Sequence, residues 1–354
     1  MFNVTFRRQV LYVFIGFVFA APFIDAIAHE CRQKTNDLFC LLEDAQETQV
    51  RLINFLETVP GKSVVLDPGV KGLKTINQLL QTRWDGDAAR ITDYARATVG
   101  VDTIFHVYQC LDVIKSSVLE IISIQDNFLS PYPEYYRDIN VVFRDRVNGH
   151  LGEVQINTLP ILDYKNTEGH HLFDQIRNIR AKVYLEGRVF LLEENQAIEQ
   201  LTRESALGYN KAFADSLKIG NKTIRVGVYG ILTHNNEVLM VKTQSGSQLI
   251  YNFPGGGVDE GEGFAQALVR ECQEEVYVDV VIKDCLHTAK NLYIHEDFPD
   301  FYMFSLYYAI EVDDIEDFYK QALAEDAKWF PINNLPLDQM LPIDREFVAC
   351  YFLQ

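Results

Sequence analysis

The chain has 354 residues and carries 50 acidic against 32 basic side chains, for a formal net charge of −18. A surface this acidic repels polyanions, which excludes a nucleic-acid polymer as partner, whereas a small nucleotide substrate remains possible because a bound metal ion brings its own positive charge. The length suffices for two domains, each with a core of its own.

The first 28 residues have the composition of a secretory signal peptide. Arg7 and Arg8 precede an almost wholly apolar run over residues 10–21, and residues 26–28 (Ala-Ile-Ala) form a small-residue cleavage pattern. The apolar run is short for a membrane span. We expect an exported or secreted protein, cleaved before His29. The alternatives are a membrane-anchored and a cytoplasmic protein, and no stable membrane partner is expected unless the leader is retained.

The six cysteines are scattered and include no C-x-x-C pair, which argues against a zinc site. Cys31 and Cys40 are candidates for a disulfide in an oxidising compartment. Cys272 occupies an apolar position and is expected to be a buried thiol. Cysteine usage leaves the compartment open.

Residues 29–219 alternate between helical and strand patterns. Pro-Gly pairs at residues 60–61 and 68–69 punctuate a predicted loop. The other expected elements are helices at 34–57, 71–77 and 104–117, a strand within 90–99, strands at 119–124, 139–143 and 151–156, and a helical stretch at 178–218. This order predicts an α+β domain built on a mixed sheet with helices on one face.

Several segments between residues 67 and 177 resemble the RelA/SpoT nucleotidyl synthetase core. They are Lys71 with Thr75-Ile76, Asp93, Pro133-Glu134-Tyr135-Tyr136-Arg137-Asp138, Gly152-Glu153-Val154-Gln155-Ile156-Asn157-Thr158 and Gly169-His170-His171. The resemblance implies that Lys71 contacts the ATP phosphates and that Tyr136 stacks on guanine. It also implies that Asp93 and Glu153 bind Mg²⁺ and activate the acceptor hydroxyl.

The chain departs from that family at positions that shape the nucleotide pocket. Tyr135 replaces a glycine, Asn140 a histidine and Asn157 an arginine, and Asp93 stands three residues before Arg96 rather than five. Each residue also has a plainer interpretation. A carboxylate alternating with apolar residues on a strand is ordinarily solvated, a lone tyrosine ordinarily packs, and the histidine pair lacks a third ligand at metal spacing.

Residues 220–354 form the second predicted domain. Gly220 and its polar neighbours mark the boundary. Strands are expected at 224–232 and 238–243, joined by a turn at Asn235-Asn236, and they lead to a glycine loop at 252–257. An apolar, aromatic-rich strand follows at 301–312, and Trp329-Phe330-Pro331 marks a late strand.

Residues 256–278 place glycine and charged side chains at fixed spacing. On a helix over residues 263–276, Glu271, Glu274 and Glu275 stand at i, i+3 and i+4 and share one face. Three such carboxylates repel one another unless a cation lies among them, and hard oxygen ligands suit Mg²⁺ or Mn²⁺. Glycine at position 256 would let its backbone carbonyl approach the metal. For the three glutamates alone, an ordinary solvated helix face is the alternative.

The full spacing, from Gly256 through Glu262 and Arg270-Glu271 to Glu274-Glu275, matches the pattern G-x5-E-x7-R-E-U-x-E-E-x-G-U. The segment is identified as the Nudix box of a Nudix hydrolase domain, which implies an α/β/α sandwich. The resemblance also implies that Arg270 and Glu262 pair and hold the loop against the helix. Tyr277 departs from the pattern, because it stands where the box has its second glycine and loses the residue suited to a left-handed turn.

These features predict Mg²⁺-dependent hydrolysis of the pyrophosphate of a nucleoside diphosphate-linked compound, fused to a RelA/SpoT-like domain linked to guanosine tetraphosphate. Glu325 and Asp326 are candidates for an extra metal ligand or the general base. The place of Tyr293 is similar to that of a tyrosine in dinucleoside polyphosphate hydrolases. The alternatives are a pyrophosphate transferase that makes guanosine tetra- or pentaphosphate, and a nucleotide-sensing binding protein.

Overall fold

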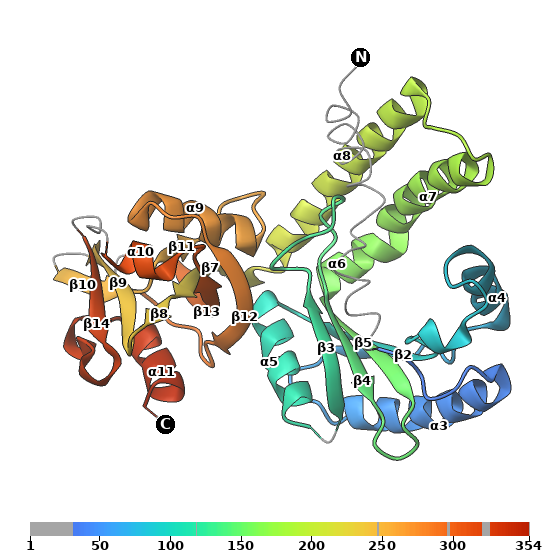
Figure 1. Ribbon diagram of the computed structural model, residues 1–354, viewed down its shortest axis with the longest axis horizontal. Helices are drawn as coiled ribbons and strands as arrows, with labels where there is room; N and C mark the ends of the chain where they lie inside the picture. The colour runs from blue at the N-terminus through green and yellow to red at the C-terminus, as the bar shows by residue number, and fades with distance from the viewer. Residues whose placement is uncertain (1–30, 118, 246–247, 296–297, 321–325, 354) are drawn as a thin grey trace. The chain divides into compact units, whose positions relative to one another are not determined.

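The computed structural model describes residues 31–117, 119–245, 248–295, 298–320 and 326–353 (Figure 1). The predicted leader lies outside these residues, so export stays a prediction. Within the described part of the chain, no helix is both long and apolar enough to cross a membrane.

The chain divides into two compact units. The first comprises the chain up to Gly100 with Leu111–Gln125 and Ile139–Ile156, and the second comprises Val101–Cys110, Asp126–Asp138 and Asn157–Gln354. The domain boundary predicted at residues 219–220 stays a prediction.

A five-stranded sheet in the order β1-β2-β5-β4-β3 is the centre of the first unit. Its strands are β1 (Val64–Leu66), β2 (Ala95–Val101), β3 (Glu120–Asp126), β4 (Ile139–Arg144) and β5 (Leu151–Thr158). Buried and half-buried residues alternate along β4, as expected for a strand with one face in the core. The loop predicted between the two Pro-Gly pairs is wrong at β1, because its three residues pair antiparallel with β2.

Three helices accompany this sheet in sequence: α3 (Leu38–Leu56), α4 (Leu73–Thr82) and α5 (Ile104–Lys115). Asp37 caps α3, since its carboxylate accepts the backbone N–H groups of Phe39 and Cys40. Apolar residues of α3, α4 and the start of β2 form one buried cluster. The three predicted helices are confirmed.

The candidate disulfide is wrong. Cys31 is buried and Cys40 is exposed, and within the described residues, which include all six cysteines, none forms a disulfide.

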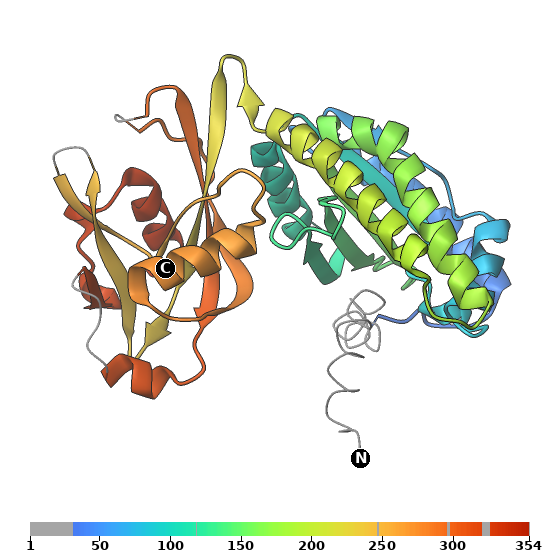
Figure 2. The same ribbon diagram turned by 90° about the horizontal axis from the view of Figure 1, so that it is seen from above.

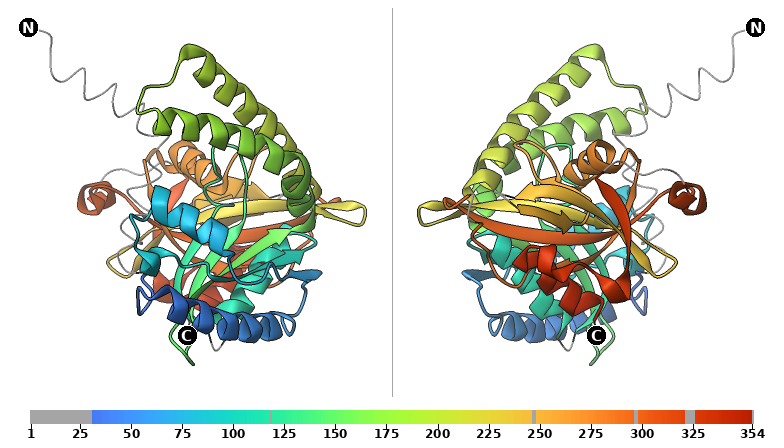
Figure 3. Two further views of the ribbon diagram at one scale, coloured as in Figure 1. Left: turned by 90° about the vertical axis from the view of Figure 1, so that its right-hand side faces the viewer. Right: turned by 90° about the vertical axis from the view of Figure 1, so that its left-hand side faces the viewer.

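The prediction of one helical stretch over residues 178–218 is wrong, because two helices separated by a turn cover these residues. Helix α6 (Leu159–Tyr164) passes through a π-helical turn, η2 (Lys165–Gly169), into α7 (His170–Leu185), and α8 (Leu192–Asp215) returns beside α7 (Figures 1 and 3).

The chain reverses between α7 and α8 at Gly187, whose φ of 60° is a left-handed conformation that glycine adopts without steric cost. Arg188 then donates to both carboxylate oxygens of Glu194 at 2.7 Å, which fixes the turn to the start of α8. Charged residues on both sides of the turn hid this break in the sequence pattern.

The C-terminal part of the second unit is built on two sheets. The first has the order β11-β7-β13-β12, with β6 paired to β7, and the second has the order β10-β9-β14, with β8 paired to β9. The strands are β6 (Lys218–Ile219), β7 (Lys222–Ile231), β8 (Thr233–His234), β9 (Glu237–Ser245), β10 (Gln248–Asn252), β11 (Gly255–Gly257), β12 (Val281–Thr288), β13 (Phe301–Glu311) and β14 (Ala327–Pro331). The sequence missed β10 and β12.

The two sheets lie between α9 (Phe264–Val276) and α11 (Pro342–Tyr351), with the short helix α10 (Ile315–Lys320) at the side (Figures 1 and 2). Strands β7 and β13 run parallel, whereas the other pairs in these sheets are antiparallel. The predicted α/β/α sandwich is confirmed. Its core includes Phe253, Tyr307 and Phe347, which contact one another edge to face or stacked.

Candidate active site

Helix α9 separates an apolar face from an acidic one. Phe264, Leu268 and Cys272 are fully buried, so the prediction of a buried Cys272 thiol is confirmed. Burial raises the pKa of that thiol to about 12. Of the acidic residues of the helix, Glu271 and Glu275 turn towards the glycine strand β11.

Two carboxylates of α9 lie against the glycines of β11. The Gly255 N–H donates to Glu275 Oε2 at 3.0 Å. A Cβ atom on Gly256 would come within 2.5 Å of Glu271 Oε1, a separation that real side chains do not adopt. The backbone of Gly256 therefore lies directly beside a helix carboxylate.

Arg270 connects the helix to the preceding loop. Its Nε and Nη2 donate to the two carboxylate oxygens of Glu262 at 2.8 and 2.9 Å. Its Nη1 donates to Glu271 Oε1 at 2.8 Å, and Nη2 reaches the Gly257 carbonyl at 3.2 Å. The planar guanidinium thus holds the loop, the glycine strand and a helix carboxylate together.

The third glutamate lies differently. The Glu274 side chain is 61 % exposed, and its Oε2 lies 3.6 Å from Arg270 Nη1. Within the described residues, no three His, Cys, Asp or Glu side chains converge on a point that would hold a metal ion. Two carboxylates are therefore placed at the glycine strand, and the third lies on the solvent side of Arg270.

The electrostatics of this face fit a cation. Burial, followed by the charges of Glu271 and Glu274, raises the pKa of Glu275 to about 7. By contrast, the Arg270 hydrogen bond lowers the pKa of Glu262. The negative charges of Glu271 and Glu274 disfavour ionised Glu275, and a divalent cation would offset them. The oxygen atoms of these carboxylates are hard ligands, which suit such a cation.

Tyr277 keeps the backbone conformation of the glycine it replaces. It ends α9 with φ 57° and ψ 36°, in the left-handed region, and its side chain is 78 % exposed. The helix exit is thus retained without glycine, at a conformational cost that a β-carbon imposes.

The remaining candidates of this domain are more peripheral. Glu325 lies outside the described residues, and Asp326 is exposed, with its backbone carbonyl accepting the Lys242 N–H. Tyr293 makes a backbone bridge to Met303 at the edge of β13.

In the first unit, the structure brings Lys71 and Asp93 together. The buried Lys71 ammonium lies 2.5 Å from Asp93 Oδ2, and Arg96 Nη1 lies 3.8 Å from the same oxygen. Glu153 is half-buried on β5, where it accepts a long hydrogen bond from Gln155. A paired, buried lysine is a polar site rather than a solvated surface residue.

Tyr136, in the second unit, is held by its hydroxyl. It donates to Asp138 at 2.9 Å and accepts from Asn157 and Lys165 at 3.2 and 3.0 Å. The Lys165 ammonium also lies 4.9 Å from the ring centroid. The ring lines a hollow of about 380 Å³ together with Tyr132, Glu134, Lys165, Gly169, His170, Phe173, Ser205 and Tyr209. Tyr135 next to it adopts a φ of 61°, in the left-handed region that favours glycine.

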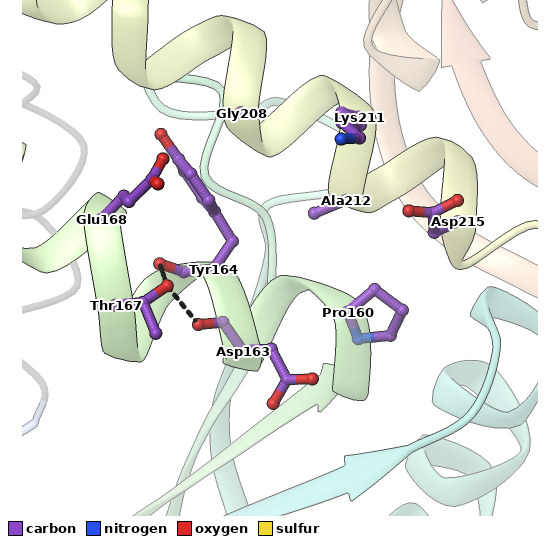
Figure 4. A pocket seen from close by; sticks show the side chains of 9 residues that line it. All are labelled: Pro160, Asp163, Tyr164, Thr167, Glu168, Gly208, Lys211, Ala212 and Asp215. Carbon is purple, nitrogen blue, oxygen red and sulfur yellow. Dashed lines mark hydrogen bonds between the residues drawn. The ribbon is translucent and has the colours of Figure 1, made fainter.

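A second hollow of about 550 Å³ lies along α6 and α8 and contains none of the predicted site residues. Its lining is Pro160, Asp163, Tyr164, Thr167, Glu168, Gly208, Lys211, Ala212 and Asp215 (Figure 4). The Thr167 hydroxyl donates to the backbone carbonyls of Asp163 and Tyr164. The charged side chains of the lining are three carboxylates, Asp163, Glu168 and Asp215, and one ammonium, Lys211.

Sequence reasoning missed two polar side chains beside the glycine strand. Arg225 and Tyr229 lie on β7, far ahead of the box in sequence, and come to Gly257 and Gly255 only through strand pairing. Arg225, Gly227 and Tyr229 are alternate residues of one predicted strand, which places all three on one face. This pattern could have pointed to them in the sequence.

Comparison with known proteins supports the assignment of the C-terminal part. Residues 221–351 match the family model of the NUDIX domain. The chain is 25 % identical over 130 residues to 8-oxo-dGTP diphosphatase of Escherichia coli, which covers 36 % of this chain and 95 % of that protein. It is 43 % identical over 63 residues to Nudix hydrolase 2 of Arabidopsis thaliana, which covers 17 % of this chain and 23 % of that protein.

Several solved structures are similar to about half of the chain. A GTP pyrophosphokinase family protein from Streptococcus pneumoniae matches 51 % of this chain and 94 % of its own, with 19 % identity and a TM-score of 0.35.

Proposed function

We propose that the Nudix domain formed by residues 221–351 is a Mg²⁺- or Mn²⁺-dependent pyrophosphohydrolase of a nucleoside diphosphate-linked compound. The observation that carries this proposal is the junction of α9 with β11. There one arginine holds Glu262, Glu271 and the Gly257 carbonyl, while Glu275 binds the Gly255 N–H. Such an arrangement fixes oxygen ligands before substrate arrives.

Glu271 and Glu275, the Gly256 carbonyl and, from the solvent side, Glu274 are the groups that would hold the metal. When bound, the cation would neutralise the pyrophosphate, polarise phosphorus and supply a hydroxide at neutral pH. Arg270 and Glu262 do not touch substrate in this proposal, since they brace the loop. One of the three helix glutamates accepts the proton of the attacking water.

A second candidate function belongs to Lys71 and Asp93. Their buried ion pair supports a nucleotide site in the first unit, and the RelA/SpoT resemblance makes guanosine tetra- or pentaphosphate a candidate product or ligand of that site. The same compound is then a candidate substrate of the Nudix domain. Pyrophosphate transfer from ATP to GDP or GTP tests the synthetase function, and nucleotide binding without turnover would indicate a sensor.

The experiment is a substrate panel for the full chain with Mg²⁺, Mn²⁺ or chelator. It contains ADP-ribose, dinucleoside polyphosphates, guanosine tetraphosphate and 8-oxo-dGTP, the last because of the name of the E. coli relative. We expect metal-dependent release of phosphate, pyrophosphate or nucleoside monophosphate from at least one compound. No turnover of any compound with either metal would contradict the hydrolase proposal.

A further inference from the structure

Arg225 and Tyr229 lie on the same face of β7, with Gly227 between them, because alternate residues of a strand share a face. Gly227 pairs with Gly257 across the antiparallel β7–β11 ladder. Neither glycine carries a side chain, so the two polar side chains have room to lie over this glycine pair, one residue along the chain from Gly256.

The Arg225 guanidinium lies directly against Gly257. A Cβ atom there would come within 2.7 Å of Nη2 and 2.9 Å of Nε. The side chain is exposed, and its one contact of note is Phe298, whose ring centroid lies 5.7 Å from the guanidinium carbon.

Arg225 makes no ion pair with any residue that the structure describes. Three other cations of the same domain are paired with carboxylates: Arg270 with Glu262, Lys283 with Glu311 and Lys320 with Glu316. In a chain with 18 more acidic than basic side chains, an arginine without a carboxylate partner is an available anion-binding group.

The Tyr229 hydroxyl lies over the second glycine of the pair, since a Cβ atom on Gly227 would come within 3.1 Å of it. The ring stacks on Tyr307 with centroids 5.6 Å apart, which fixes its direction. Within the described residues, this hydroxyl has no hydrogen-bond partner. Burial and the charges of Asp344, Glu275 and Glu271 raise its pKa, while Arg225 lowers it, so the hydroxyl lies within range of both charge groups.

We propose that Arg225 and Tyr229 form a phosphate-binding subsite beside the glycine strand, which takes a phosphate of the pyrophosphate-linked substrate next to the metal-bound oxygens. A planar guanidinium with several donors and a rigid hydroxyl suit a tetrahedral oxyanion. This subsite rests on the proposed function for its substrate, whereas its existence as an anion site can be measured without turnover.

The test is binding of imidodiphosphate, a non-hydrolysable pyrophosphate analogue, to the full chain by calorimetry with Mg²⁺ present. Arg225→Gln should weaken binding by about 10- to 100-fold, as expected for losing a charged hydrogen bond, and Arg225→Lys by less. Tyr229→Phe should weaken it by about 3- to 10-fold, as for a neutral hydrogen bond. Lys283→Gln, which removes one paired cation of the same domain, should leave binding unchanged.

The subsite is overturned if Arg225→Gln binds imidodiphosphate as tightly as Lys283→Gln does, or if the wild-type chain does not bind it. It is also overturned if orthophosphate binds as tightly as imidodiphosphate, because the site would then serve free phosphate. If Arg225→Gln loses binding but the wild type hydrolyses no substrate, the phosphate subsite is supported and the proposed hydrolase function is contradicted. Hydrolysis by the wild type together with unchanged binding in Arg225→Gln would support the hydrolase and overturn the subsite.

Discussion

The two candidate sites differ in how the chain assembles them. The Nudix site is made by one glycine strand and the helix that follows it, so the groups from Gly256 to Glu275 are placed by helix periodicity and one arginine brace. The ion pair of Lys71 and Asp93 joins two loop segments, one before α4 and one before β2, and depends on how these segments pack. In a contiguous motif, the spacing along one helix sets the positions of the side chains. In a dispersed site, the packing of distant segments sets them.

One buried carboxyl in the second unit and one buried imidazole in the first differ in how they respond to pH. The second unit buries Asp344, which is 1 % exposed and accepts a hydrogen bond from the Tyr307 hydroxyl at 2.9 Å. The first unit fully buries His150, whose ring nitrogens have no hydrogen-bond partner in the described chain. The contributions of these two groups to stability should therefore change with pH in opposite directions, and this contrast gives the largest expected effects.

Asp344→Asn should stabilise the second unit at pH 8. Burial raises the pKa of Asp344 from 3.8 to about 7, so its contribution to stability is fully present below pH 3.8 and is lost as the pH rises through 7. The neutral asparagine escapes this loss, and we expect a gain of up to about 4 kcal/mol in unfolding free energy at pH 8.

The measurement is denaturant unfolding followed by Trp329 fluorescence in a Trp84→Phe background, because the chain has two tryptophans and one lies in each unit. At pH 4 the variant and its parent should agree. An equal difference at both pH values would show that Asp344 does not titrate as described.

His150→Phe should protect the first unit against acid. Burial lowers the pKa of His150 from 6.5 to about 4, so its contribution is present above pH 6.5 and is lost as the pH falls through 4. A phenyl ring keeps the contact with Tyr94 and does not titrate. We expect a gain of about 3 kcal/mol at pH 4 relative to pH 8, measured by Trp84 fluorescence in a Trp329→Phe background. A pH-independent difference would refute the buried neutral histidine.

Arg270→Gln tests whether the contiguous site depends on its brace. It removes the hydrogen bonds to Glu262, Glu271 and the Gly257 carbonyl. We expect kcat/KM to fall by about 100-fold, equivalent to about 2.7 kcal/mol, because the glycine strand and Glu271 lose their common anchor. Arg270→Lys should recover only part of the rate, since an ammonium cannot donate the paired hydrogen bonds that the planar guanidinium makes to Glu262. Full activity of the lysine variant would show that charge alone suffices.

The smallest effect compares the two tyrosines that replace motif glycines. Tyr277→Gly should stabilise the second unit by about 1 kcal/mol, because it relieves a left-handed conformation at an exposed position. Tyr135→Gly should gain less, since the Tyr135 ring lies 5.5 Å from the Arg137 guanidinium and that contact is lost. Thermal unfolding of both variants measures the difference. A larger gain in stability for Tyr135→Gly than for Tyr277→Gly would contradict a stabilising contact between Tyr135 and Arg137.

The sequence predicted the contiguous site well, because spacing on one helix fixes which side chains share a face. It placed Glu262 with Arg270, buried Cys272 and identified the helix exit at Tyr277, and all three agree with the structure. It did not place Arg225 and Tyr229, since their neighbours come from strand register. It also missed the break at Gly187, where a charge-rich helical pattern continues across a turn.

The most direct test of the central claim compares two glutamate substitutions in the full chain. The Glu274 and Glu316 side chains are both 61 % exposed, and both contact cations. On whichever substrate the panel identifies, Glu274→Gln should lower metal-dependent kcat by at least about 100-fold with an unchanged melting temperature, as for removal of one stabilising group at a reacting centre. Glu316→Gln should retain wild-type turnover. Unchanged turnover in Glu274→Gln would contradict the assignment of the Nudix site.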